Sequence, residues 1–290
     1  FSQIEIEERY ERMKAAKDID WVGSYSAAYR AEVFKKLKGF DESFPIASGE
    51  DPELSYRVEK EGWKLVFNSK TKLVSLKKFV SPKKMFNDKY AHRASASKTM
   101  CLAYSKLAKS ISRKYKPKSI LEIGSNDGVF IKHFKRINNI GVEPCKNLAR
   151  ITNKMKIKTY DEFWTTKLSK KITRQNKLFD VIYSANTVSH IHDLNETFEA
   201  INNSLNDNGI FILEDPSLVE VLKNKSYDQF YDEHAYVFSI IALKNITKRA
   251  GLQIFNIEKL KTHGGSNRVY FKKYNNNKIK VSNNVLKHLN

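Results

Sequence analysis

Cysteine is scarce in this sequence, and its scarcity excludes two kinds of protein. Only Cys101 and Cys145 occur among 290 residues, too few for a disulfide framework or a cysteine-based zinc site. We therefore expect a reducing, cytoplasmic location and no bound metal. Neither an initiator Met nor a signal peptide opens the sequence at Phe1, so we interpret the chain as a fragment.

Long apolar runs are also missing. The best candidate, 236–243, is interrupted by Lys244, whereas a membrane-spanning helix needs about 20 consecutive apolar residues. The sequence therefore predicts no membrane span. Hydrophobic residues still make up 41% of the chain, which allows a sizeable buried core, and the length favours two domains.

Acidic residues are outnumbered by basic ones, 32 to 52, which gives a formal charge of +20. Such a charge can indicate nucleic acid or an anionic membrane surface as a partner. The lysines, however, are scattered among asparagines and isoleucines, without an arginine-rich helix or a nucleic-acid motif. We interpret the charge as a solvated basic surface that favours anionic, nucleotide-linked substrates, and we expect no nucleic-acid partner.

The chain is organised around Ser119–Gly128, which reads SILEIGSNDG. An apolar β-branched run ends at Gly124, a polar turn containing Asn126 and Asp127 follows, and apolar residues resume at helical spacing after Gly128. This pattern predicts a strand, a glycine loop and a helix. Such a unit binds ligands beyond the carboxyl end of the strand, where glycines let the backbone approach and a helix N-terminus offers N–H groups.

The next predicted strand ends in Glu143, a carboxylate able to accept both ribose hydroxyls of a nucleoside. This order favours an adenosyl-binding site. A nicotinamide site is the alternative, but it normally shows G-x-G-x-x-G, and here only Gly124 and Gly128 are glycines. An ordinary tight strand-to-helix turn would also explain the loop if the loop stood alone.

From Lys118 onward, strands and helices alternate regularly, which is typical of a doubly wound α/β sheet. We predict seven strands with a late hairpin-like pair, which suits a Rossmann-like class I methyltransferase sheet better than the six strands common in dehydrogenases. The predicted strands cover residues 119–123, 139–143, 157–160, 179–184, 209–214, 253–258 and 268–273.

Polar residues follow the fourth and fifth predicted strands. Asn186 and His190 come just past the fourth, where side chains face the ligand crevice, so His190 is a candidate base or substrate ligand. A metal site formed by His190 and His192 lacks a clear third ligand nearby, and an exposed loop histidine is the simpler interpretation of His192. Glu214, at the end of the fifth strand, is a candidate substrate ligand.

A second polar cluster contains Tyr231, Glu233 and His234. These residues supply a phenol, a carboxylate and a proton acceptor within four positions, which is enough for base-assisted chemistry with oxyanion stabilisation. A polar helix start would explain the acidic residues but gives no reason for His234. Upstream, Tyr90 lies in a segment rich in aromatic and hydroxyl residues, which is either a lid over a sugar pocket or a helix-capping region.

The loop before the last strand, THGGSNR, is suited to a sugar or a phosphate because paired glycines expose backbone groups between polar side chains. A plain hairpin turn would need only the glycines. The candidate substrate-binding residues in this loop are His263, Gly264, Gly265 and Arg268.

Residues 1–80 differ in character from the rest of the chain. Their GFDE, ED and SYR elements resemble the C-terminal part of family 2 inverting glycosyltransferases. The resemblance implies that Asp51 is the general base on the acceptor hydroxyl, since an inverting displacement needs one carboxylate opposite the leaving nucleotide. Glu50 and Asp51 also suit the start of a helix at Pro52. Because the metal-binding acidic motif has no counterpart here, we expect shared ancestry without activity.

The motifs LEIGSNDG, NTVSHIHD, EDPS, YDEHAYVFS and THGGSNR occur in this order. Over about residues 86–273 the chain resembles the sugar C-methyltransferases that act on nucleotide-linked 4-keto deoxysugars. The resemblance implies S-adenosylmethionine as methyl donor and a base that removes the proton alpha to the ketone. It implies catalytic roles for His234, Tyr231, Glu233, His190 and Tyr90. It implies cofactor-binding roles for Glu122, Gly124, Asn126, Asp127, Gly128, Glu143 and Asn186.

We expect four segments in the chain: a glycosyltransferase-like piece at 1–80, a linker and helical lid at 81–117, the methyltransferase domain at 118–275 and a truncated tail at 276–290. The family also carries a cysteine-based zinc module and a long C-terminal domain, to which we find no counterpart. The main alternative is a glycosyltransferase-type protein whose methyltransferase-like domain only binds or scaffolds. A nucleic-acid methyltransferase, suggested by the charge alone, is a weaker one.

Overall fold

In the computed structural model of the chain, the described residues are 18–19, 65–68, 73–76, 80–224, 229, 233–260, 262 and 264–289. The chain divides into two compact units. The first consists of Phe1–Val80, Pro216–Leu243 and Lys259–Ser266, and the second of Ser81–Asp215, Lys244–Glu258 and Asn267–Asn290. The domain boundaries and the glycosyltransferase-like character of residues 1–80 stay predictions.

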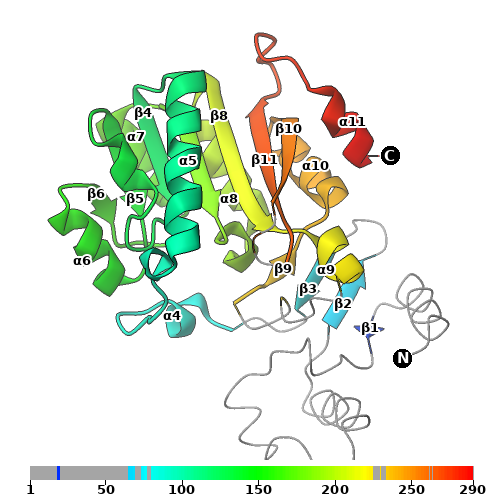
Figure 1. Cartoon of the computed structure of the whole chain (residues 1–290), viewed down its shortest axis with the longest axis horizontal. Helices are drawn as coiled ribbons and strands as arrows, with labels where there is room; N and C mark the ends of the chain where they lie inside the picture. The colour runs from blue at the N-terminus through cyan, green and yellow to red at the C-terminus, as the bar shows by residue number, and fades with distance from the viewer. Residues whose placement is uncertain are drawn as a thin grey trace, which may run out of the picture. The chain divides into compact units, whose positions relative to one another are not determined.

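The larger sheet has seven strands in the order β10-β11-β8-β7-β4-β5-β6 (Figure 1). The first strand of this sheet in chain order, β4, lies in the interior of the sheet. The chain continues from it to β5 on one side and later returns to β7 on its other side. This reversal is the topological switch point at which open α/β sheets bind ligands. The strands are β4 (Ser119–Ile123), β5 (Asn138–Val142), β6 (Lys158–Tyr160), β7 (Phe179–Ala185), β8 (Leu205–Pro216), β10 (Leu252–Leu260) and β11 (Ser266–Lys273).

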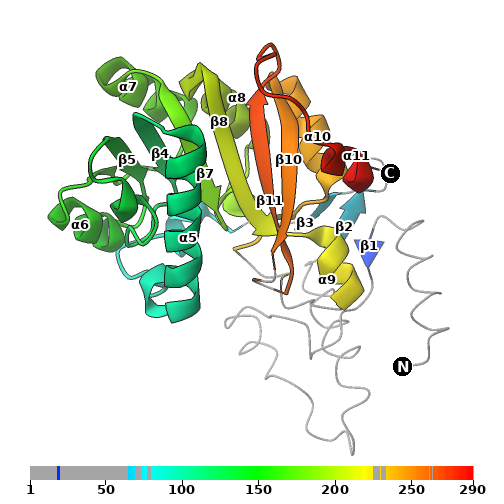
Figure 2. The same ribbon diagram turned by 45° about the horizontal axis from the view of Figure 1, so that its top comes forward.

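The pairs β4–β5, β4–β7, β5–β6 and β7–β8 are parallel. Strands β10 and β11 lie side by side in Figures 1 and 2 and are joined by residues 261–265 alone. A parallel crossover needs a dozen or more residues, so this last pair is antiparallel. The predicted doubly wound α/β sheet, with its seven strands and late hairpin, is confirmed.

Helices cover both faces of this sheet, and α5 crosses one face in Figure 1. The N-terminus of α5 is capped by Ser97, whose hydroxyl accepts the Met100 N–H, and its end is marked by Lys116 in the left-handed region. The helices are α4 (Pro82–Met85), α5 (Lys98–Tyr115), α6 (Lys146–Lys154), α7 (Thr166–Asn176), α8 (Leu194–Ser204), α9 (Leu218–Asn224), α10 (Ile240–Arg249) and α11 (Asn283–Leu289).

The core beneath α5 is aromatic. Tyr104 of this helix lies edge-on to Tyr183 of β7, with ring centroids 6.4 Å apart. The ring centroid of Phe130 lies 4.0 Å from that of Tyr183. On the opposite side of the sheet, Phe198 of α8 packs edge-on against Phe211 of β8, with ring centroids 6.3 Å apart. Large aromatic rings are therefore buried on both faces of the sheet.

The α-helix predicted after Gly128 is wrong. A short 3-10 helix, η3 (Ile131–Phe134), occupies this position. The physical reason is that the Glu122 carboxylate accepts the Ile131 N–H at 3.1 Å and that Phe130, just before the turn, and Phe134, its last residue, are both buried. Apolar residues spaced by three or four also fit one 3-10 turn, so the sequence pattern did not separate the two structures.

The first unit contains a smaller antiparallel sheet in the order β1-β2-β3-β9. Its strands are β1 (Asp18–Ile19), β2 (Leu65–Asn68), β3 (Leu73–Leu76) and β9 (Tyr236–Val237). Val74 and Val237 pack there with Leu218 and Val221 of α9. Of the helices in the described part of the chain, none has both the length and the apolar character needed to span a bilayer.

Candidate functional site

The glycine loop lies at the carboxyl end of β4. Gly124 has φ of +74° and donates its N–H to Val142 O at 2.8 Å, which ties the loop to the end of β5. A Cβ at Gly124 would overlap Oγ1 of Thr187, which lies just after β7. The absent side chain therefore allows the ends of β4, β5 and β7 to approach closely. Gly128 closes the loop with φ of +79° and donates to Ser125 O.

Glu143 lies directly beyond β5 and reaches back to the loop. Its Oε2 accepts the Asn126 N–H at 2.8 Å, and its Oε1 accepts the Cys145 N–H at 2.9 Å. The side chain is buried, and burial raises the pKa of the Glu143 carboxyl, while the two backbone N–H bonds oppose that rise. Each carboxylate oxygen can still accept a second hydrogen bond, which gives two ribose hydroxyls the pair of acceptors that they require.

Asn126 and Asp127 hold a segment from far upstream. Asn126 Oδ1 accepts the Ala94 N–H at 2.9 Å, and Asn126 Nδ2 donates to His92 O at 3.3 Å. Asp127 accepts the Ser95 N–H at 3.3 Å and also the Ser95 hydroxyl. We name residues 92–95 the strap. The two loop residues therefore fix the strap as well as shaping the turn.

Glu122 lies below the loop, within the sheet. Its carboxylate accepts the Ile131 N–H, and it is 5% exposed. Burial, with smaller contributions from Glu143 and Asp127, raises the pKa of the Glu122 carboxyl well above its usual range. This placement gives Glu122 a supporting role under the loop, and its predicted direct contact with a cofactor stays a prediction.

The loop after β7 contains two predicted site residues, Asn186 and His190, and His190 contacts Phe86, which was not predicted as a site residue. Asn186 has φ of +48°, and its N–H donates to Glu214 O at 2.8 Å. His190 stacks on Phe86, with ring centroids 5.4 Å apart and planes at 11°. Phe86 also contacts Tyr90 at 5.4 Å. Tyr90 and His190 are therefore both neighbours of Phe86, which the sequence interpretation left out.

Glu214 and Arg268 form an ion pair with each other. Arg268 Nε lies 2.6 Å from Glu214 Oε1, and its Nη1 lies 2.9 Å from Glu258 Oε2. The side chains of Glu214 and Arg268 are 9% and 15% exposed. Since the guanidinium already bridges two carboxylates, the substrate-binding roles predicted for Glu214 and Arg268 stay predictions.

Asp215 is a buried acid that the sequence interpretation missed. Its Oδ1 accepts the Ser189 hydroxyl at 2.9 Å, and its Oδ2 has no hydrogen-bond partner among the described residues. Burial raises the pKa of the Asp215 carboxyl to about 8, against the opposing effect of the Ser189 hydrogen bonds. Its position beside Glu214 in the EDPS motif was the available signal.

His234 and Glu233 belong to the first unit. Nδ1 of His234 lies 2.7 Å from Gln229 O. That contact favours the tautomer with the proton on Nδ1, which makes Nε2 the basic nitrogen. In the same unit, Gly264 and Gly265 have φ of +70° and +119°, as a tight glycine turn requires.

The carbonyls of this glycine turn accept hydrogen bonds. Gly264 O accepts from Asn224 Nδ2 at 2.8 Å, and Gly265 O accepts the Ser217 N–H at 3.0 Å. These two bonds therefore tie the glycine turn to both ends of α9, at Ser217 just before its start and at Asn224, its last residue. Three predicted site residues lie outside the described residues, namely Asp51, Tyr231 and His263.

The carboxylate of Glu143 and the backbone of the glycine loop together suit a nucleoside better than a metal ion. Among the described residues, no three His, Cys, Asp or Glu side chains converge into a possible metal site. The glycine loop supplies close backbone approach, and Glu143 supplies hydroxyl acceptors at the switch point. An adenosyl group fits these residues on chemical grounds.

Comparison with known proteins agrees with this arrangement. A family model described as a methyltransferase domain matches residues 90–257. The C-methyltransferase NovU from Streptomyces niveus is 30% identical over 149 residues, which cover 51% of this chain and 36% of NovU. The chain thus matches about a third of the length of this relative.

Similar solved structures include an S-adenosylmethionine-dependent methyltransferase from Clostridium acetobutylicum, 15% identical, with a TM-score of 0.46 over 59% of this chain and 90% of that chain. Another is the magnesium protoporphyrin IX methyltransferase from Synechocystis with bound SAH, 10% identical, with a TM-score of 0.45 over 60% of this chain and 83% of that chain.

Proposed function

The chain belongs to the methyltransferase domain family, and from this premise we propose that it uses S-adenosylmethionine to methylate a carbon atom of a nucleotide-linked 4-keto deoxysugar. The observation that carries the proposal is the 30% identity to a C-methyltransferase over 149 residues. That stretch adds to the family match over residues 90–257. S-adenosylmethionine supplies an electrophilic methyl group, so the remaining task of the protein is to generate a nucleophilic carbon.

Residues of the second unit would hold the donor. Gly124 admits the ligand close to the backbone, and Glu143 accepts the ribose hydroxyls while two backbone N–H groups hold its carboxyl group in place. The cationic sulfonium of the donor is also favoured by nearby carboxylates such as Asp127. These contacts bind and orient the donor without taking part in proton transfer.

His234 is our candidate base. A carbon alpha to a ketone becomes nucleophilic when its proton is removed, because the C–H electron pair then forms an enolate with the charge on oxygen. His234 Nε2 would accept that proton, since Nδ1 is turned to Gln229 O. Tyr231 and Glu233 remain the candidates for orienting the base, and His190 and Tyr90 keep the catalytic roles proposed for them.

Gly124→Ala tests the donor site. We expect the variant to be destabilised by about 1–3 kcal/mol, the usual cost of a left-handed backbone at a non-glycine residue. The added methyl also overlaps Thr187 Oγ1, so S-adenosylmethionine should bind at least roughly tenfold more weakly. Calorimetric titration of the purified variant measures the binding.

Gly251→Ala is the matched control for that variant. Gly251 has φ of +77°, and its added Cβ would meet only the flexible Asn202 amide at 3.1 Å. It therefore carries a similar backbone cost and should leave donor affinity unchanged. Equal donor affinity in Gly124→Ala and the wild type would remove the assigned donor site.

His234→Gln tests the carbon-methylation chemistry. With labelled S-adenosylmethionine and a nucleotide-linked 4-keto sugar, methyl transfer should fall roughly 100-fold or more, as is usual when a general base is lost. The wild type should also exchange the alpha proton for deuterium in heavy water, and the variant should not. His133→Gln, a change at an exposed histidine of η3, is the control that should keep full activity.

Two results would contradict this proposal. Transfer of the label to a hydroxyl oxygen or a nitrogen would leave the methyltransferase in place and end the carbon assignment. Undiminished deuterium exchange in His234→Gln would show that another group removes the proton. The same labelled assay with the corresponding 4-hydroxy sugar should give no product, since that substrate has no acidic C–H bond.

A further inference from the structure

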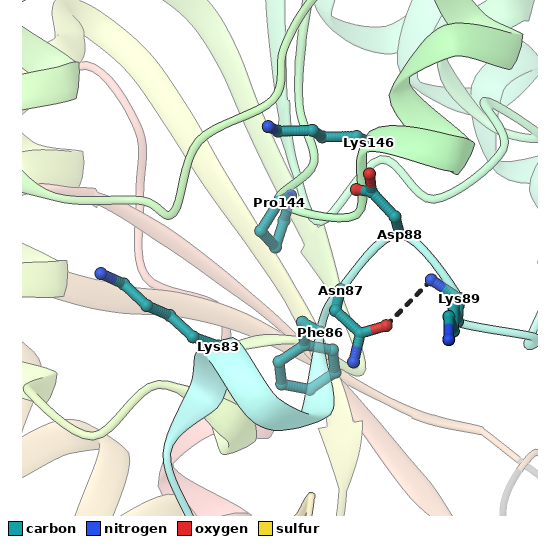
Figure 3. Close-up of a pocket in the computed structure, with 7 residues that line it drawn as sticks. All are labelled: Lys83, Phe86, Asn87, Asp88, Lys89, Pro144 and Lys146. Atoms are coloured by element: carbon teal, nitrogen blue, oxygen red, sulfur yellow. Dashed lines mark hydrogen bonds between the residues drawn. The ribbon is translucent and has the colours of Figure 1, made fainter.

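A pocket of about 600 Å³ in the second unit is not used by the proposed chemistry (Figure 3). One wall comes from the end of α4 and the turn that follows it, and the other comes from the connection between β5 and α6. The second wall begins at Pro144, the residue after Glu143. The pocket therefore opens at the ligand-binding edge of the parallel sheet.

The pocket is positively charged. Lys83, Lys89 and Lys146 line it, and none of the three forms an ion pair with a carboxylate in the described part of the chain. Its one lining carboxylate, Asp88, lies 3.9 Å from Arg150. Because that acidic charge has its own partner, the three ammonium groups give the pocket a net preference for an anion.

The lining also has an apolar part. Phe86 and Pro144 are both half-buried, and one face of Phe86 is stacked on His190 at 5.4 Å. In Figure 3, Lys146 passes above Pro144 and Lys83 lies below it, with both side chains reaching toward the same side of the view, and Lys89 lies on the other side of the turn. A ligand with an anionic group among the lysines and a flat or apolar group against Phe86 would match both parts of the lining.

The turn that carries these residues is internally fixed. Asn87 Oδ1 accepts the Lys89 N–H at 2.9 Å, the dashed contact in Figure 3, and Asn87 Nδ2 donates to Lys84 O at 2.8 Å. The Tyr90 carbonyl in turn accepts from Asn147 Nδ2 of α6 at 2.8 Å. These bonds hold both walls of the pocket in place without occupying the lysine ammonium groups.

We propose that this pocket binds the diphosphate of the nucleotide-linked substrate, with Lys83, Lys89 and Lys146 as the anion-binding residues. The inference rests on the proposed function and adds the subsite that recognises the substrate's charge. A diphosphate link carries about two negative charges, which lysines bind as point charges. S-adenosylmethionine has no phosphate, so its adenosine would not require this charge.

Titration of UDP into the full chain tests the proposal. Each Lys→Gln change at 83, 89 or 146 should weaken UDP binding by roughly three- to tenfold, and the triple variant by at least roughly 30-fold. Binding to the wild type should weaken as salt rises. Inorganic pyrophosphate should compete with UDP in the wild type. Lys109→Gln, at an exposed position on α5, is the matched control and should change nothing.

S-adenosylmethionine affinity separates this inference from the proposed function. The triple variant should keep its donor affinity within twofold, which also shows that it is folded. Unchanged UDP affinity in the triple variant would overturn the proposal, as would no UDP binding by the wild type. A loss of donor affinity with intact UDP binding would assign the pocket to the adenosine instead. If UDP binding depends on the lysines but no keto sugar is methylated, the pocket stands and the proposed function fails.

Discussion

Replacing Arg268 by alanine is expected to lower the free energy of unfolding by about 3–5 kcal/mol, the usual cost of breaking a buried ion pair from one side. The physical reason is that Glu214, 9% exposed, would lose the guanidinium that lies 2.6 Å away and stay buried without a partner of opposite charge at that position. The low accessibility of the site keeps water from taking over that role. Urea denaturation of the wild type and the variant measures the difference.

Glu258→Ala is the control for this effect. Glu258 contacts the same guanidinium at 2.9 Å but is 43% exposed, so its loss should cost no more than about 1 kcal/mol. A double variant, Glu214→Gln with Arg268→Met, should recover much of the stability, since it leaves no buried charge. A single Arg268→Ala variant as stable as Glu258→Ala would contradict the buried-pair account.

Asp215→Asn is expected to stabilise the protein at neutral and alkaline pH. In the folded state burial holds the pKa of the Asp215 carboxyl at about 8, whereas in the unfolded chain it ionises near 3.8. Between these values the native state keeps a proton that the unfolded state has released, so the free energy of unfolding falls as pH rises. Above pH 8 both states are ionised and the penalty is fully present.

The size of this effect follows from the pKa difference. One pKa unit corresponds to about 1.4 kcal/mol, so the wild type should lose up to about 4 kcal/mol between pH 4 and pH 7 through this carboxyl alone. Asp215→Asn keeps an acceptor for the Ser189 hydroxyl and removes the titration. Its advantage should therefore vanish near pH 4 and grow toward pH 8.

Urea denaturation at several pH values measures that advantage. Asp161→Asn, at an exposed position after β6, is the control and should show no comparable pH trend. A constant difference between Asp215→Asn and the wild type across pH 4–8 would show that Asp215 is ionised when folded.

The strands were the most predictable part of the fold. Runs such as 119–123 and 179–185 are mostly apolar and largely buried on both faces because helices cover the sheet on both sides, and buried parallel strands of this kind can be predicted directly from sequence. The turn after Gly128 was not predictable in the same way. Its conformation depends on a carboxylate from the preceding strand, Glu122, binding the Ile131 N–H, and residue spacing carries no information about that bond.

The candidate site was predictable only where a motif coincides with a strand end. Gly124 and Glu143 were found because each follows a predicted strand, and the structure joins them through Val142 and Asn126. The strap contacts were not found, because Ala94 and Asn126 are 32 positions apart and long-range hydrogen bonds leave no periodicity. The lysine-lined pocket was missed for a similar reason, since its two walls are remote in sequence.

The hydrogen bonds between the strap and the glycine loop also bear on engineering. Three of these bonds use backbone groups of the strap, namely the His92 carbonyl and the Ala94 and Ser95 N–H groups, and only the Ser95 hydroxyl is a side-chain partner. A strap grafted from another enzyme would therefore keep most of the contact if it follows the same path, has no proline at positions 94 and 95 and keeps a hydroxyl residue at 95. Replacing Asn126 and Asp127 would remove every one of the four bonds, so a chimaera has to preserve the loop side chains rather than the strap sequence.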